Sequence, residues 1–147
     1  MKKVGEYTVR GQVEHNVEDK ITLFDGRFDT GYVVKKFYLY PNSGIGAGND
    51  CHGVLYTEPG AVSSGLDWDF GENEQIGWAA GIFSGASAFA SDGNGLVDPD
   101  NLIIEDVFLK ANHSGTDGVC GYLIVMEKYE FTDWKGALAM VRNRSQS

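Results

Sequence analysis

The run VCGYLIVMEKYEF, residues 119–131, decides the fold class of this chain. In an extended strand Leu123 and Val125 lie on one face, and Ile124 and Met126 lie on the other. Apolar side chains on both faces predict a strand that is covered on both sides along its first half. Charged residues enter the pattern towards its end, so one face is expected to meet solvent there.

The run NLIIEDVFLKA, residues 101–111, has the same β-branched and aromatic character. The polar stretch HSGTDG, residues 113–118, separates the two runs and consists of residues typical of turns. Two such runs joined by a short glycine-containing loop predict a long antiparallel hairpin. We expect this hairpin to form the centre of a sheet.

Shorter strands are predicted through the first half of the chain. EYTVRGQV, residues 6–13, alternates apolar and polar side chains, as a half-buried strand does. YVVKKFYLY, residues 32–40, carries bulky side chains on both faces and predicts a central, covered strand. Further strands are expected at KITLF, CHGVLYTE and LDWDF, which are residues 20–24, 51–58 and 66–70.

The composition supports an all-β fold. The chain has 147 residues, the length of one ordinary domain. Its 20 glycines are about twice the average usage, and turn signals recur about every 8–12 residues, as in a sandwich or jelly roll. We therefore expect one antiparallel β-sandwich domain of the jelly-roll type over residues 1–133, followed by a short C-terminal helix or arm over residues 134–147.

The charge limits the class of partner. The net charge of −9 argues against nucleic acid, because phosphate contacts need clustered lysines and arginines, and against an anionic membrane surface. The sequence shows neither a secretory signal nor an apolar run of transmembrane length, so we expect a protein that is used without export. Cys51 and Cys120 are too few for a disulfide framework and are expected to be free and buried, although a single bridge between them stays open.

The pattern of ligand-type residues predicts no metal or cofactor. The three histidines, His15, His52 and His113, are not spaced as zinc ligands. The glycines of NSGIGAGND, residues 42–50, lack the spacing and the following helix of a phosphate-binding loop. SDGNGLVDPDN, residues 91–101, holds acidic and amide side chains without EF-hand spacing, so these are read as turn residues, with a weak calcium site left open.

Two other functional classes compete with a structural role. Asp67, Asp69 and Glu72 are candidates for the carboxylate pair of a glycoside hydrolase, but the two aspartates would share one solvated strand face, so this class ranks last. Trp68, Trp78 and Trp134 are candidates for stacking on sugars, which makes a carbohydrate-binding β-sandwich the main alternative. Tryptophans also fill sandwich cores, and we expect that role for most aromatic residues here.

The end of the chain differs from the rest in charge. Residues 1–133 hold nine basic residues and all 21 acidic ones, whereas residues 134–147 hold three basic residues and no acidic one. Apolar residues recur there at helical spacing, and Thr132 or Asp133 precedes them as a candidate N-cap. We expect an arm that docks on an acidic neighbour, such as a second copy of the chain, through Trp134, Leu138, Met140, Val141, Arg142 and Arg144.

Several stretches resemble small virion proteins of tailed bacteriophages, especially marine ones: NEQIGWA, DPDNLIIEDVFLKA, YLIVMEKYEF and GALAMVRNRSQ. The resemblance runs from about Thr22 to Gln146, and the glycine-rich segment 43–50 departs from it. It implies a non-enzymatic structural protein of the particle, such as a capsid decoration or cement protein. It further implies a homo-oligomer, often a trimer, that contacts capsid or other virion subunits and is assembled in the bacterial cytoplasm.

Overall fold

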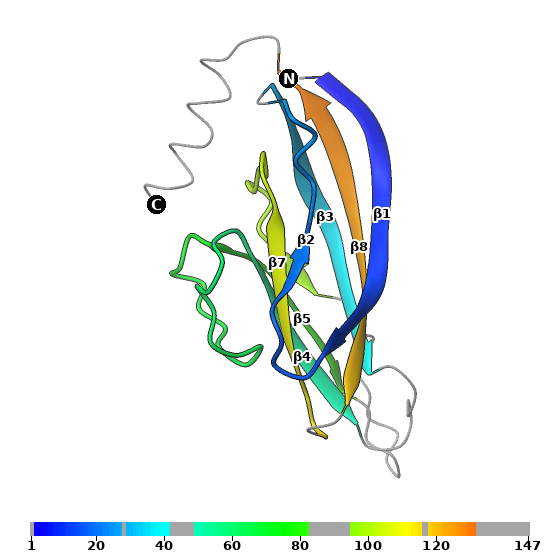
Figure 1. The fold of residues 1–147 in the computed structure, drawn as a ribbon, viewed down its shortest axis with the longest axis vertical. Helices are drawn as coiled ribbons and strands as arrows, with labels where there is room; N and C mark the ends of the chain where they lie inside the picture. The colour runs from blue at the N-terminus through cyan, green and yellow to red at the C-terminus, as the bar shows by residue number, and fades with distance from the viewer. Residues whose placement is uncertain (1, 28, 42–48, 83–94, 116–117, 132–147) are drawn as a thin grey trace.

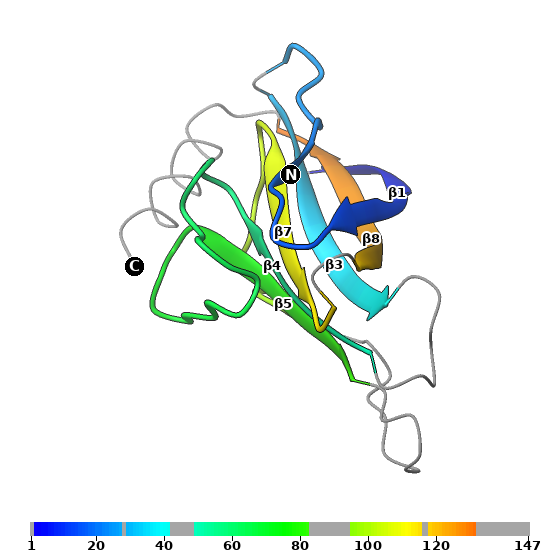
Figure 2. The same ribbon diagram turned by 60° about the horizontal axis from the view of Figure 1, so that its bottom comes forward.

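The computed structural model describes residues 2–27, 29–41, 49–82, 95–115 and 118–131, and strands make up its two antiparallel sheets (Figure 1). The three-stranded sheet has the order β1 (Lys2–Glu14), β8 (Val119–Glu130), β3 (Thr30–Pro41). The five-stranded sheet has the order β2 (Asp19–Ile21), β7 (Val107–His113), β4 (Asp50–Tyr56), β5 (Gln75–Ile82), β6 (Leu96–Val97). The sheets pack face to face, which confirms the predicted all-β sandwich (Figures 1 and 2).

The strand pairing is nested, as in a jelly roll. β1 pairs with β8 and β2 pairs with β7, while β3 and β4 return to pair with the same two partners from the other side. The chain thus alternates between the two sheets from β1 to β4 and again from β7 to β8, whereas β4, β5, β6 and β7 all lie in the five-stranded sheet. The nested part of this pairing, in which β1 and β3 flank β8 and β2 and β4 flank β7, is like that of a jelly roll.

The predicted hairpin of residues 101–111 and 119–131 is wrong. β7 and β8 are consecutive strands, but they lie in opposite sheets. β7 lies between β2 and β4, and β8 lies between β1 and β3. The strand predicted at 32–40 is present and carries buried residues on both faces, such as Val33 and Val34, but its predicted central position is wrong, since β3 lies at the end of its sheet. Local patterns identify the strands, but strand partners in a jelly roll are distant in sequence.

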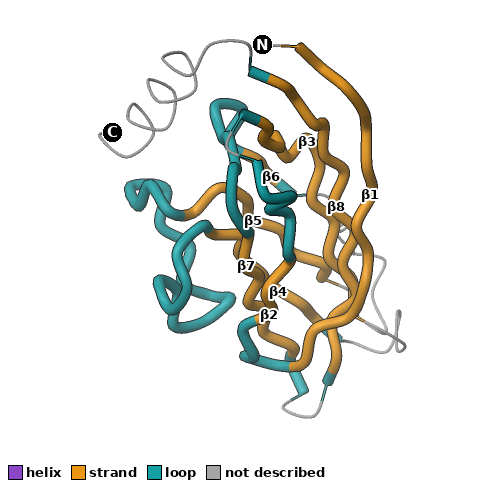
Figure 3. Tube along the Cα trace, turned by 45° about the horizontal axis from the view of Figure 1, so that its top comes forward, coloured by secondary structure: helices purple, strands orange, loops and turns teal. Residues whose placement is uncertain are grey.

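The segment LDWDF, residues 66–70, is not a strand. It belongs to the long excursion between β4 and β5, which lies over the outer face of the five-stranded sheet (Figure 3). Val62 of this excursion is buried, and it packs in a cluster with outward-facing residues of the sheet, namely Val54, Tyr56, Trp78 and Phe108. The excursion thus forms a third layer, which we call the cover loop (residues 57–74).

The main core lies between the two sheets. Its fully buried side chains include Phe37 and Leu39 from β3, Leu55 from β4, and Ile124 and Met126 from β8. Burying a side chain of this size stabilises the fold by roughly 1.5–3 kcal/mol. This interface between sheets is the largest apolar cluster of the described residues.

The C-terminal arm of residues 134–147, with its predicted helix and all six predicted docking residues, lies outside the described residues. Phe131, the last described residue, is buried against Val33 and Leu102. The described residues contain no helix that could cross a membrane.

Candidate binding site

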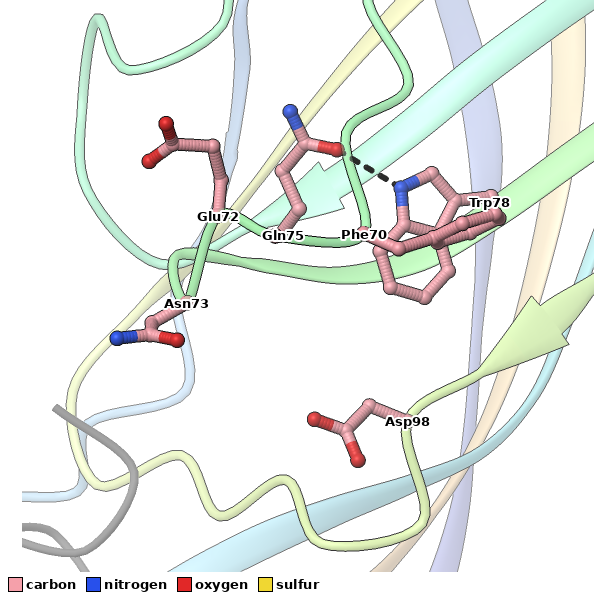
Figure 4. A pocket seen from close by; sticks show the side chains of 7 residues that line it. Phe70, Glu72, Asn73, Gln75, Trp78 and Asp98 are labelled. Atoms are coloured by element: carbon pink, nitrogen blue, oxygen red, sulfur yellow. Dashed lines mark hydrogen bonds between the residues drawn. The ribbon is translucent and has the colours of Figure 1, made fainter. Parts of the chain in front are cut away.

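A solvent-open pocket of about 370 Å³ lies where the cover loop meets β5 and the start of the turn after β6 (Figure 4). Loop, strand and turn contribute side chains of different chemistry to it. The lining residues are Phe70, Gly71, Glu72, Asn73, Gln75, Trp78 and Asp98. The pocket therefore combines two aromatic rings with carboxylate and amide groups.

Two aromatic side chains, Phe70 and Trp78, form one side of the pocket. Their ring centroids are 4.6 Å apart and the rings are almost perpendicular, at 79°. Trp78 is only 6% exposed, because its other side packs in the cluster under the cover loop, whereas Phe70 is 67% exposed. Leu96 pairs with Trp78 across the β5–β6 ladder and is 62% exposed. Phe70, Trp78 and Leu96 are called the apolar wall below.

The side chain of Gln75 holds the indole of Trp78 and the loop next to Phe70 in place. Its side-chain Oε1 accepts hydrogen bonds from Trp78 Nε1, at 2.8 Å, and from the backbone N of Asp69, at 2.9 Å. Its Nε2 donates to the backbone O of Asp67, at 2.9 Å. A buried amide with all these bonds made holds both the indole and the loop in one arrangement, so the pocket is formed before any partner arrives.

The rim of the pocket is acidic. Glu72 and Asn73 belong to the cover loop, and Asp98 faces them from the turn after β6 (Figure 4). Asp98 is held there by its backbone N, which donates to Ile76 O at 2.9 Å. Oxygen atoms beside an apolar wall suit a partner that presents both an apolar side chain and a cation, or a partner that presents hydroxyl groups.

Glu18 attaches the opposite end of the cover loop to the body. Its carboxylate accepts hydrogen bonds from Tyr56 Oη, at 2.6 Å, and from the backbone N of Gly60, at 2.8 Å. The hydrogen bond from Tyr56 is the main reason that the pKa of Glu18 lies below its usual value. Burial, followed by this same bond, raises the pKa of Tyr56. The cover loop is therefore fixed at both ends.

The candidate hydrolase carboxylates, Asp67, Asp69 and Glu72, all lie in the cover loop. Asp67 accepts a hydrogen bond from Ser63, and Asp69 accepts one from the backbone N of Gly71, as turn-forming aspartates do. Of the three, only Glu72 lines the pocket. The part of the chain that the structure describes holds no group of three or more His, Cys, Asp or Glu side chains that could hold a metal ion.

The residues that line this pocket were not predicted from the sequence to lie together. Trp68 and Trp78 were candidates for sugar stacking, but Trp68 lies outside the pocket, where its ring meets that of His52 at 6.4 Å between centroids. Phe70 and Asp98 join Trp78 through the fold. No family model matches this chain, and no curated protein matches it either.

Proposed function

We propose that this chain is a non-enzymatic structural protein of a tailed-bacteriophage particle, a decoration or cement protein that stabilises the capsid by binding copies of itself and other virion subunits. The resemblance of its sequence to small virion proteins supports this proposal. The jelly-roll fold is compatible with it, since viral capsid proteins and lectins both use this architecture, but a fold alone does not assign a function.

The observation that carries the proposal is the apolar wall. Two of its three side chains, Phe70 and Leu96, are more than 60% exposed and flank the indole of Trp78. Clustered exposed apolar side chains rimmed by polar groups mark interaction surfaces on soluble proteins. Gln75 holds the Trp78 indole and the loop backbone next to Phe70, so this part of the wall loses little conformational entropy when a partner binds.

The occupant that we propose is the C-terminal arm of a neighbouring copy. Residues 134–147 carry three basic and no acidic side chains, which complements a rim formed by Glu72 and Asp98. Trp134 and Leu138 supply apolar side chains for the apolar wall, and Arg142 and Arg144 supply the cations. Exchange of arms around a ring of copies gives a closed homo-oligomer, for which a trimer is our expectation.

The test reverses the charge of the arm in the full-length chain. The double variant Arg142→Glu/Arg144→Glu is expected to reduce the molar mass measured by light scattering from that of the oligomer to the 16.0 kDa of one chain. The matched control, Arg10→Glu/Lys36→Glu, makes the same charge change on the exposed outer surface of the three-stranded sheet.

The control is expected to keep the oligomer. An arm variant that assembles like the unmodified chain would contradict the role of the arm. A control variant that dissociates equally would show that net charge, rather than the arm, governs assembly.

A second candidate function is carbohydrate binding, and the composition of the pocket favours it. An aromatic ring exposed beside carboxylate and amide groups is suited to stacking on a sugar ring while accepting hydrogen bonds from its hydroxyls. A glycan array with the full-length chain and with Phe70→Ala separates the two functions. Binding that disappears in the variant supports the carbohydrate function, and an array without binding by the unmodified chain rejects it for the glycans tested.

A further inference from the structure

Cys51 and Cys120 meet across the interface between the two sheets. Their Sγ atoms are 2.7 Å apart, although the residues are separated by 69 positions in the sequence. Both are free thiols, and both side chains are 0% exposed. Cys51 lies on β4 and Cys120 on β8, and each of these strands has a neighbour on both sides within its own sheet.

We propose that Cys51 and Cys120 form an intramolecular disulfide that joins the two sheets when the protein meets an oxidising environment. The bond would connect the interior strand of one sheet to the interior strand of the other. It would close a loop of about 70 residues, and long loops give the largest stabilisation when they are closed by a cross-link.

The local spacing of the sheets permits this bond. Packed sheets normally lie about 10 Å apart, whereas the Cα atoms of a disulfide lie about 4.4–6.8 Å apart. Two glycines beside Cys51 allow a closer approach. A Cβ atom on Gly81, the ladder partner of Cys51, would lie 2.5 Å from the backbone O of Leu39, and one on Gly53 would lie 2.8 Å from Leu39 Cδ2. The backbone of β3 therefore occupies the space that side chains would fill elsewhere.

The chemistry is thiol–disulfide exchange with a small disulfide such as oxidised glutathione. The thiolate of one cysteine attacks a sulfur of the small disulfide, which gives a mixed disulfide and releases one small thiolate. The thiolate of the other cysteine then attacks the protein sulfur of this mixed disulfide and releases the second small thiolate. The protein loses two electrons and two protons, and the small disulfide becomes two thiols.

The environment of the thiols makes this reaction slow in the folded protein. The hydrogen bond to Cys120, followed by burial, raises the pKa of Cys51, so the thiolate is scarce. A small disulfide reaches the pair only when the end of the sandwich opens locally. The protein would thus stay reduced in a cytoplasm and become oxidised after long exposure outside one.

The test uses the full-length chain, reduced and then incubated with a mixture of reduced and oxidised glutathione at a temperature just below its melting transition. Blocking of thiols under denaturing conditions followed by mass spectrometry is expected to show one bond between Cys51 and Cys120, with a mass about 2 Da below that of the reduced chain. The melting temperature of the oxidised chain is expected to rise by roughly 10 °C.

The control is Cys51→Ala/Cys120→Ala, whose melting temperature should be the same with and without the oxidant. Near the melting temperature local opening is fast enough to let the small disulfide reach both thiols. If both thiols can still be chemically blocked after this incubation, no bond has formed and the proposal is overturned. Mixed disulfides with glutathione alone, or bonds between chains, would also overturn it. The comparison of oxidised and reduced unmodified protein does not depend on whether the double variant folds.

Discussion

The two faces of the five-stranded sheet are covered in different ways. The inner face packs against the three-stranded sheet, where small residues bring the backbones together and the side chains are fully buried. The outer face is covered by a loop, which hydrogen bonds with the side chains of Gln75 and Glu18 attach to the body. This loop leaves a pocket open at the edge. The inner interface therefore supplies stability, and the outer one carries the surface that we propose for recognition.

Phe37→Ala is expected to have the largest effect on stability. Phe37 is fully buried between the sheets, so the substitution removes a large apolar side chain and leaves a cavity. The free energy of unfolding should fall by about 3–5 kcal/mol, as measured by urea denaturation. Phe70→Ala, the same change on the exposed wall, should shift it by less than about 0.5 kcal/mol. Equal losses in the two variants would remove the distinction between the faces.

Gly81→Ala tests the close approach of the sheets. The added methyl group would meet the backbone O of Leu39, which cannot rotate away. We expect a loss of about 1–3 kcal/mol in unfolding free energy and a smaller fraction of the Cys51–Cys120 bond at equilibrium with a glutathione mixture. A variant as stable as the unmodified chain, with unchanged oxidation, would show that the sheets do not need to be this close.

Gln75→Leu tests how the outer surface is fixed. The indole N–H of Trp78 and the backbone N of Asp69 lose their acceptor. The expected loss is about 1–3 kcal/mol, and faster hydrogen exchange of the backbone amides is expected in the cover loop but not in β8. Exchange that rises equally in both regions would mean that the loop is not an independent layer.

Acidification is expected to have the smallest effect and to act on the same loop. The pKa of Glu18 is lower in the folded chain than in the unfolded one, so its contribution to stability is present above the unfolded value of 4.5 and is lost as the pH falls through the folded value. The protection of the Gly60 amide from hydrogen exchange, relative to the intrinsic rate at each pH, should therefore fall below about pH 4.5. Glu18→Gln should show fast exchange at Gly60 already at pH 7, and a pH profile identical to that of the unmodified chain would contradict this role.

The sequence predicts the strands of this protein better than the connections between them. Alternating and two-sided apolar runs identify β3, β4 and β8, because the period of two depends only on the local backbone. The partner of β8 could not be read in the same way, since β1 lies more than a hundred residues away. Residues 66–70 alternate like a strand, but the turn bonds of Asp69 and Gln75 hold them in a loop.

The pocket could be predicted only in part, for the same reason. Trp78 was a candidate residue from its type alone, whereas Phe70 and Asp98 reach it from separate segments, and nothing in their local sequence indicates this. The contact between Cys51 and Cys120 could not be predicted either. It exists because β4 and β8 belong to two different sheets that pack against each other.

The most direct test of the proposed function is zero-length cross-linking of carboxylates to amines in a mixture of unlabelled and ¹⁵N-labelled full-length chains. We predict bonds between Lys135 of one copy and Glu72 or Asp98 of another, seen by mass spectrometry as peptide pairs of mixed label. Cross-links of the arm that join only peptides of the same label, or that never include the rim of the pocket, would contradict the account.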